Sequence, residues 1–374
     1  MAETHSTAKA EARPEPRESN EADPPPRPLI CFAGQDWWYH NRAHSDFQLM
    51  TRLAKERPVL LVNSIGMRMP SPGKSANILR KIFRKLRSTA KLLRRPLPDV
   101  PNYWVLSPLV VPTYGSPLGR KFSAAFTRFQ VKLAARWLGL RKPDVFVTVP
   151  TAMPVVRGMS HGKLIYNRSD KHSEFREADQ DHIRGLEEEL IARSDHVLYV
   201  NGTLLEEERD RTGDRAYLLD HGVAVDLFDA SVATDEPDDL KAIAHPRVGF
   251  FGSLRPHLVD FDLIGAIADG LPDVQIVLVG DPQASTEALA GRSNIHLLGF
   301  KEYRDVPRYG AALDVALMPY HDNDWIRYSN PIKLKEYLSL GLPVVCSDLP
   351  KAPPENPQKY HAAGAHELRA GIRA

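Results

Sequence analysis

Short apolar runs alternate with helical patterns from Leu29 onwards. In the first half of the chain, the runs expected to form strands are 29–34, 59–64, 103–107, 144–149, 163–167 and 196–201. Helical patterns lie between most of them, for example at 119–138 and 181–193. Nearly continuous apolar strands separated by helices are typical of a parallel sheet that is covered on both faces. The first half is therefore predicted to be an α/β domain.

The same alternation starts again after a polar, acidic stretch at 231–246, which we interpret as a linker. Further strands are expected at 247–253, 274–280, 294–300, 315–320 and 342–345, with helices at 260–270, 304–314 and 330–341. The pattern predicts two Rossmann-like, doubly wound domains, 29–230 and 247–350, that face a cleft. In such folds the carboxyl ends of the strands bind ligands.

The two ends of the chain and its cysteines point to a cytoplasmic protein. Residues 1–28, rich in Pro, Glu and Ala, predict a disordered tail without the apolar core of a signal peptide. Residues 351–374 are expected to form a short carboxyl-terminal tail. No uninterrupted apolar run approaches the roughly 20 residues of a membrane-spanning helix. Cys31 and Cys346 lie in strand-like runs and are expected to be buried thiols, as in a reducing cytosol.

The helix expected at 330–341 carries two charges among apolar residues. Asn330 is a suitable N-cap, Pro331 suits the first helical position and Gly341 can end the helix. A helix amino terminus attracts anions, and Lys333 strengthens this attraction for phosphate. Glu336, one turn further on, can accept hydrogen bonds from vicinal hydroxyls such as those of a ribose. Together they suggest a nucleotide site, although such pairs also stabilise solvated helices by about 0.2–0.5 kcal/mol.

Several segments in the correct order resemble the GT-B glycosyltransferases, particularly the retaining family 4, or group 1. "NPIKLKEYLSLGLPVVCSD" is similar to their carboxyl-domain signature, and "VGFFGSL" and "VQIVLVGD" to their glycine loop and the following strand. "NIHLLGFKEYRDVPRYGAALDVALMPY" resembles the segment near the nucleotide base, and "SDHVLYVNGTL" and "HGVAVDLF" the end of the acceptor domain. The resemblance spans residues 29–350. It implies a glycosyltransferase that moves a sugar from a nucleotide diphosphate sugar to a hydroxyl, with retention and without a bound metal.

The resemblance also implies a donor site in the second domain. In the family, the glutamate at the position of Glu336 holds the ribose, while a second glutamate eight positions earlier is replaced here by Tyr328. The diphosphate is expected near the backbone of Gly252 and Ser253, with positive charge from the side chains of Arg255, Arg327 and Lys333. The base is expected against Phe300 and Tyr303. The nucleotide sugar is a co-substrate, and no cofactor is expected.

The loop that follows the first strand suggests an acceptor site. Gly34 permits a tight turn, and Trp37 and Trp38 are suited to stack on a sugar, unless one of them packs the loop instead. Asp36 and His40 are candidates to bind an acceptor hydroxyl as catalytic groups. Asp170, in a second polar cluster, is a third candidate.

Residues 57–98 contain no acidic residue, and the segment 74–95 has nine Lys or Arg around an apolar helical face. Such a segment can lie on an anionic membrane. Nucleic acid is a competing partner without a recognised motif, and a solvated flap is a further alternative. Membrane contact would place the protein at the inner face of a membrane, where it would build a polysaccharide or glycolipid.

Two other functions fit the same fold. A non-hydrolysing nucleotide-sugar epimerase would use acid and base groups in the cleft, but it would leave the basic segment unexplained. A degenerate transferase acting as a scaffold would account for the missing first glutamate.

Overall fold

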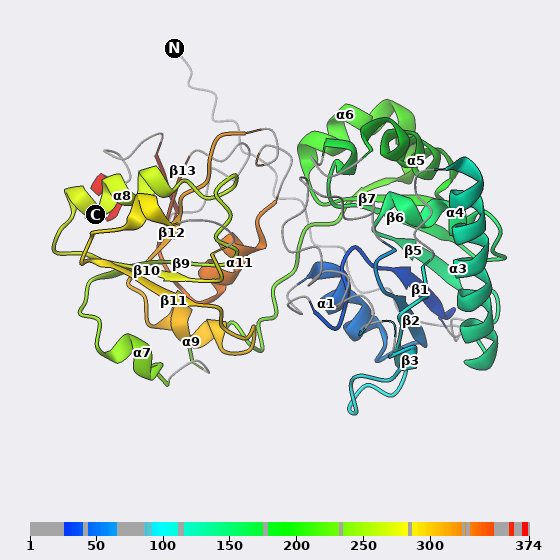
Figure 1. Ribbon diagram of the computed structural model, residues 1–374, viewed down its shortest axis with the longest axis horizontal. Helices are drawn as coiled ribbons and strands as arrows, with labels where there is room; N and C mark the ends of the chain where they lie inside the picture. Colours follow the sequence, from blue (N-terminus) through cyan, green and yellow to red (C-terminus); the bar gives the residue numbers. More distant parts are fainter. Residues whose placement is uncertain are drawn as a thin grey trace, which may run out of the picture.

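The computed structural model forms two α/β lobes joined by an extended connection (Figure 1). It describes residues 26–39, 44–65, 87, 89, 91–110, 116–174, 179–231, 235–282, 286–323, 326, 330–347, 359–362 and 369–372. The predicted tail up to residue 25, the basic segment at 74–86, His40, Arg327 and Tyr328 lie outside these residues.

The amino-terminal domain is built on an eight-stranded sheet in the order β3-β4-β2-β1-β5-β6-β7-β8, parallel except for β3 against β4. The strands are β1 (Leu29–Phe32), β2 (Val59–Val62), β3 (Leu93–Arg94), β4 (Tyr103–Leu106), β5 (Asp144–Val147), β6 (Leu164–Arg168), β7 (His196–Tyr199) and β8 (Ala216–Leu218). The described helices are α1 (Ser45–Leu53), α3 (Pro117–Trp137), α4 (Met153–Val156), α5 (Gln180–Arg193) and α6 (Gly202–Thr212). All six strands predicted for this half are therefore present, with β3 and β8 added at the edges.

Apolar side chains leave this sheet on both faces. Ile30 and Phe32 of β1 belong to one buried cluster, whereas Leu29 and Cys31 belong to another. Alternate residues of a strand point to opposite faces, so a strand covered on both sides must be apolar throughout. The predicted parallel sheet with two covered faces is confirmed.

The carboxyl-terminal domain holds a parallel sheet of six described strands in the order β11-β10-β9-β12-β13-β14. They are β9 (Arg247–Phe251), β10 (Gln275–Val279), β11 (Ile295–Gly299), β12 (Val315–Met318), β13 (Val344–Ser347) and β14 (Lys359–Ala362). The helices are α7 (Asp238–Lys241), α8 (Phe261–Gly270), α9 (Val306–Ala311) and α11 (Ile332–Ser339). Within the described part of the chain, no helix is both long and apolar enough to cross a membrane.

The second domain extends past both ends expected from the sequence. Leu240 and Ile243, in the stretch interpreted as a linker, are buried in the core of this domain. Strand β14 pairs with β13, so the sheet continues beyond residue 350.

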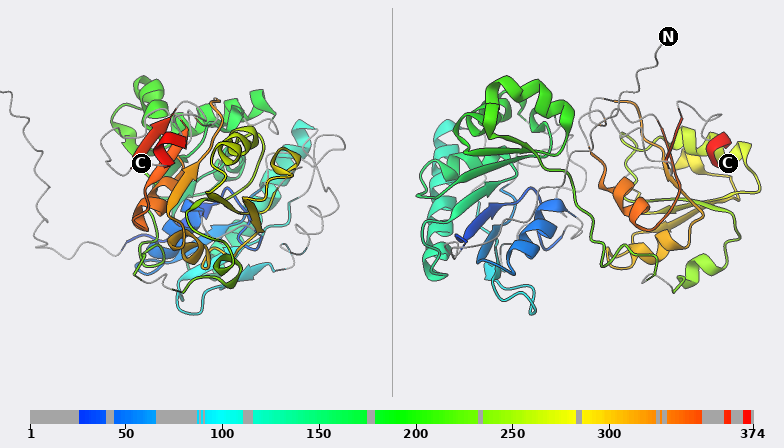
Figure 2. Two further views of the ribbon diagram at one scale, coloured as in Figure 1. Left: turned by 90° about the vertical axis from the view of Figure 1, so that its left-hand side faces the viewer. Right: turned by 180° about the vertical axis from the view of Figure 1, so that it is seen from behind.

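The start of α11 contacts the amino-terminal domain. The Asn330 side-chain amide donates to the carbonyl oxygen of Val200 at 2.7 Å and to Oδ1 of Asp220 at 2.6 Å. Lys335 forms an ion pair with the same Asp220 carboxylate. Val200 and Asp220 follow β7 and β8, so the amino end of α11 lies against the carboxyl end of the first sheet. Figure 2 shows this helix, in orange, on the side of its domain that faces the other lobe.

Candidate functional site

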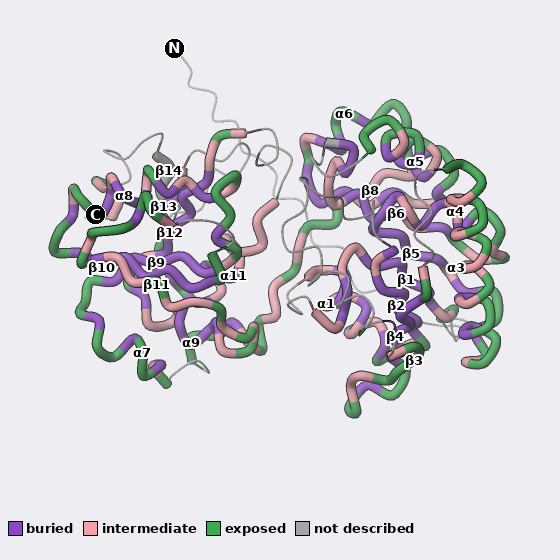
Figure 3. The backbone as a smooth tube through the Cα atoms, viewed as in Figure 1, coloured by how far each residue is buried: buried purple, intermediate pink, exposed green. Residues whose placement is uncertain are grey.

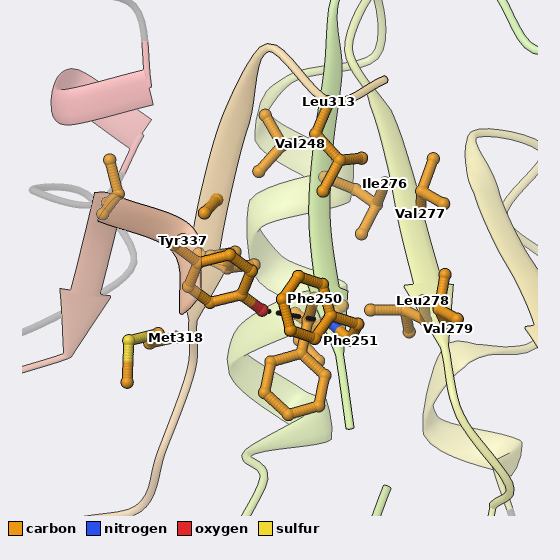
Figure 4. Packing of buried hydrophobic residues seen from close by; sticks show 14 of the residues in the cluster. Val248, Phe250, Phe251, Ile276, Val277, Leu278, Val279, Leu313, Met318 and Tyr337 are labelled. Carbon is orange, nitrogen blue, oxygen red and sulfur yellow. Dashed lines mark hydrogen bonds between the residues drawn. The ribbon is translucent and has the colours of Figure 1, made fainter. Parts of the chain in front are cut away.

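Helix α11 is fastened to the end of β9 through Tyr337. Its hydroxyl accepts a hydrogen bond of 3.0 Å from the backbone N–H of Phe251, the last residue of β9 (Figure 4). The two rings also pack at a centroid distance of 4.4 Å. Leu334 and Leu338 pack partly buried against the same core. Leu334, Tyr337 and Leu338 therefore form the apolar face that α11 turns to the sheet.

The two ends of α11 differ from each other in how well the sequence predicted them. Gly341 follows the C-cap residue Leu340 with a φ of 75°, and its N–H donates to the carbonyl oxygen of Leu338, which confirms the predicted end. The predicted capping role of Asn330 is wrong. Pro331 is the N-cap residue, and the Asn330 side chain instead reaches the other domain.

Lys333 lies directly over Gly252. The fold thus brings together two of the residues predicted to bind the sugar donor. A Cβ atom on Gly252 would lie 2.0 Å from Cε and 2.8 Å from Nζ of Lys333. Gly252 also has a φ of 147°, which other residues rarely adopt. The missing side chain at Gly252 thus leaves room for a lysine at the carboxyl end of β9.

Glu336 is a buried carboxylate one turn along the helix from Lys333. Its side chain is only 4% exposed, and Oε1 accepts a hydrogen bond of 3.1 Å from the Tyr303 hydroxyl. Burial raises the pKa of Glu336, whereas the charge of Lys333 and the Tyr303 hydrogen bond oppose that rise. A carboxylate has about four acceptor positions, so Glu336 retains the capacity to accept bonds from a diol.

The other predicted donor residues lie around this pair. Tyr303 is half-buried, packs on Phe228 at 5.5 Å and donates a hydrogen bond to Glu336. Its expected contact with a base stays a prediction. Phe300 is 58% exposed and keeps a free ring surface. Ser253 and Arg255 are exposed in the loop that follows β9.

The charge of one residue of the amino-terminal domain acts on the same site. Burial and the charge of Glu336 raise the pKa of Tyr303, and the positive charge of Arg52 counteracts this rise. Arg52 belongs to α1, the helix that follows the candidate acceptor loop. The sequence analysis missed Arg52, because an arginine on a helix gives no signal of its position relative to another domain.

The candidate acceptor loop is held by buried polar groups. The Gly34 N–H donates to Oδ2 of Asp46 at 3.1 Å. Asp36 is 8% exposed, and its Oδ1 accepts from the N–H of Trp38 at 3.0 Å. The Asp46 carboxylate that accepts the Gly34 bond is also buried, and burial raises its pKa. Asp36 therefore shapes the loop at the end of β1 with at least one of its oxygens.

The two tryptophans of the loop have different environments. Trp37 is 4% exposed and packs on Phe47 and Tyr103 at 5.1 and 5.0 Å, so it packs the loop and cannot stack on an acceptor. Trp38 is half-exposed, and its Nε1 donates to Ser107 at 2.9 Å. The alternative that one tryptophan is structural is therefore correct for Trp37.

Asn63 is a buried organiser that the sequence analysis missed. Its Oδ1 accepts from the N–H of Trp37 at 2.9 Å, and its Nδ2 donates to Ser107 at 2.8 Å. Asn63 and Ser107 follow β2 and β4, so the carboxyl ends of three strands are tied together. Asn63 and Ser107 are polar residues at the ends of predicted strands, and this position could have identified them from the sequence.

Asp170 follows β6 at the same edge of the sheet as Asp36. Burial raises the pKa of Asp170 to about 7, although the charge of Arg168 opposes the rise. Strands β1 and β6 are separated only by β5, which places the two strand ends about 10 Å apart. A carboxyl group with this pKa can exchange a proton near neutral pH.

A buried ionic cluster lies beneath Asp170. Arg168, 2% exposed, pairs with Glu187 and, at 3.1 Å, with Glu208. Burial and the charge of Arg168 lower the pKa of His172 to about 3, so this histidine is neutral at physiological pH. The cluster fixes the segment that carries Asp170.

Comparisons with known proteins agree with this geometry. Residues 245–367 match the family model of glycosyl transferases, group 1. TuaH of Bacillus subtilis, whose name assigns it provisionally to teichuronic acid biosynthesis as a glycosyltransferase, is 29% identical over 194 residues. That match covers 50% of this chain and 48% of TuaH, so it spans about half the length of the relative.

Solved structures match nearly the whole chain. Sucrose-phosphate synthase from Thermosynechococcus elongatus has a TM-score of 0.64 at 15% identity, covering 93% of this chain and 89% of its own. Anabaena HepE has a TM-score of 0.59 at 15% identity, covering 93% and 88%. Trehalose 6-phosphate synthase from Burkholderia multivorans has a TM-score of 0.60 at 12% identity, covering 93% and 90%. The chain therefore has the GT-B fold, and its carboxyl-terminal domain resembles the group 1 glycosyl transferases.

Proposed function

We propose that the protein is a glycosyltransferase that moves a sugar from a nucleotide diphosphate sugar to a hydroxyl of a glycan acceptor. The observation that carries this proposal is the pairing of buried Glu336 with Lys333 over Gly252. A carboxylate suited to a ribose and a cation suited to a diphosphate lie one helical turn apart. They lie at the carboxyl end of a parallel sheet, where such folds bind ligands.

Lys333 would stabilise the leaving nucleotide diphosphate. Cleavage of the sugar–phosphate bond builds negative charge on that group, and a fixed cation aimed at it lowers the barrier. The amino end of α11 adds partial positive charge in the same region. We propose retention at the anomeric carbon and no bound metal, in line with the family resemblance.

The acceptor would bind at the carboxyl edge of the amino-terminal sheet. Asp36 and Asp170 offer carboxylates there, and the half-exposed Trp38 offers an aromatic edge. The likeness to TuaH supports an acceptor in surface polysaccharide biosynthesis. We propose that this acceptor is lipid-linked or polymeric and is met at the cytoplasmic face of a membrane, with contact through residues 74–95.

Calorimetry with UDP-, GDP- and ADP-sugars tests the donor site. UDP is a natural first choice, because HepE was crystallised with UDP and glucose. We expect the wild-type protein to bind one nucleotide family and Glu336→Gln to bind it at least tenfold more weakly, about 1.4 kcal/mol. Glu188→Gln, at an exposed position of α5, is the matched control and should bind as the wild type does. Failure of the folded wild type to bind any of the three families would refute the proposal.

A further inference from the structure

Helix α3 exposes a stripe of large apolar side chains on the face turned away from its own domain. The exposed fractions are 78% for Leu118, 60% for Phe122, 62% for Phe129, 57% for Leu133 and 68% for Trp137. At about 100° per residue, these five positions fall within an arc of about 100°. The buried residues Thr127, Val131, Ala134 and Ala135 lie on the opposite side of the helix. The stripe is therefore a second apolar face, distinct from the one that packs on the sheet.

All charged residues of α3 are basic. Its 21 residues include Arg120, Lys121, Arg128, Lys132 and Arg136 and no acidic residue. Arg128 is held by the carbonyl groups of Pro154 and Val155 at 2.6 and 2.8 Å. Lys121, Lys132 and Arg136 are exposed, and at about 100° per residue they lie along one edge of the apolar stripe.

The apolar surface continues beyond the helix. Gln130 accepts a hydrogen bond from the Leu109 N–H at 2.8 Å and donates to its carbonyl oxygen at 2.9 Å. This places Leu109, which is 48% exposed, beside α3. Trp137 meets Trp104 of β4 edge-on at 5.4 Å. The exposed rings and aliphatic groups thus form a surface over two elements of the fold.

This surface lies at the outer side of the amino-terminal domain. Helix α3 runs along the edge of the molecule that is remote from the carboxyl-terminal domain (Figure 1), and much of its outer face is exposed (Figure 3). The contacts of Asn330 and Lys335 with Asp220 lie at the other side of the same sheet, beyond β7 and β8. Among the described residues, the contacts between the two domains therefore do not cover α3.

We propose that α3 docks the amino-terminal domain on an anionic lipid surface. A helix with a wide apolar face bordered by lysine and arginine inserts its apolar side chains at the headgroup boundary, while its cations meet anionic headgroups. Tryptophan and snorkelling lysines suit that boundary. A second copy is a poorer occupant, because a two-fold contact through this face would bring its cations together. The inference adds a second lipid contact to the one proposed for residues 74–95, and it does not depend on the proposed transfer reaction.

Vesicle flotation tests the lipid contact. The full chain is mixed with vesicles of phosphatidylcholine alone or with 3:7 phosphatidylglycerol:phosphatidylcholine. We expect the wild type to float with the anionic vesicles and the double variant Phe122→Gln/Phe129→Gln to partition at least tenfold less. Lys121→Gln/Lys132→Gln should reduce binding to the anionic vesicles and narrow the difference in binding between anionic and neutral vesicles.

Matched substitutions at other surface positions test whether the loss of vesicle binding is specific to α3. Leu218→Gln removes a side chain that is also 60% exposed, but on β8. Lys55→Gln/Arg211→Gln removes two exposed cations from other helices or turns. Both controls should float as the wild type does, and circular dichroism should show that all variants remain folded.

Three results would overturn the inference. The first is a folded wild type that does not float with anionic vesicles, and the second is unchanged flotation of the phenylalanine variant. The third is a wild type that does not bind vesicles and that analytical ultracentrifugation shows to be a dimer, while the phenylalanine variant is a monomer. This result would assign α3 to self-association.

Discussion

The Tyr337 hydroxyl accepts the backbone N–H of Phe251 at 3.0 Å, and this bond sets α11 on the carboxyl end of β9. Both residues are buried. Gly252, the next residue, begins the loop that Lys333 covers. The position of the candidate donor cation relative to the loop therefore depends on a hydrogen bond within the core.

Tyr337→Phe is expected to destabilise the carboxyl-terminal domain by about 1–3 kcal/mol. The change leaves the buried Phe251 N–H without its acceptor, and an unsatisfied buried donor costs that much. Urea unfolding measures the loss. Tyr217→Phe, at a half-exposed residue of β8, is the control and should change stability by less than about 0.5 kcal/mol. Equal stability of the two variants would show that the bond contributes nothing.

Gly252→Ala is expected to weaken nucleotide binding at least tenfold, about 1.4 kcal/mol, by displacing Lys333. The new Cβ would lie 2.0 Å from Lys333 Cε, so the lysine has to move away from the loop. Gly291→Ala is a suitable control, because Gly291 also has a positive φ, 78°, but has open space around it. Calorimetry compares the two affinities, and tight binding by Gly252→Ala would place the diphosphate elsewhere.

The sequence predicted best what depends on near neighbours. Six strands of the first domain were found because they are mostly apolar and most are separated from the next by a helical pattern. Strands β3 and β8 have only two and three residues and are largely half-buried or exposed, so they carry little periodic signal. Strand β14 lies past a Pro-rich stretch, which hid its return to the sheet.

The candidate site shows the same limit. Lys333 and Glu336 stood out because they lie three residues apart on one helix. By contrast, Asn330 contacts Asp220 from 110 residues away, and the charge of Arg52 reaches Tyr303 from another domain. Trp37 and Trp38 are adjacent in sequence, yet only the packing around β1 and β4 decides which is buried. Such contacts depend on how the strands assemble in space.

Asn330→Ala is expected to loosen the contact between the domains. The change removes the hydrogen bonds to Val200 and Asp220 and keeps the exposed Lys335–Asp220 pair, which stabilises by about 0–1 kcal/mol. Small-angle scattering should report a larger radius of gyration for the variant. Asn323→Ala removes a side-chain hydrogen bond to His257 within the carboxyl-terminal domain and should leave the radius of gyration unchanged. An unaltered radius in Asn330→Ala would show that other contacts set the domain arrangement.

Asp170 is expected to make transfer dependent on pH near neutrality. If it accepts the proton of the acceptor hydroxyl, it must be ionised, and burial has raised its pKa to about 7. Below pH 7 the carboxyl is mostly protonated and inactive, so kcat/KM should rise with pH and reach half its maximum near pH 7. Asp170→Asn should lose at least 100-fold in kcat/KM and the rise with it. Asp181→Asn, at the exposed start of α5, should retain the wild-type kcat/KM and its rise with pH. A wild-type profile of kcat/KM that is flat from pH 5.5 to 8.5 would exclude Asp170 as the base.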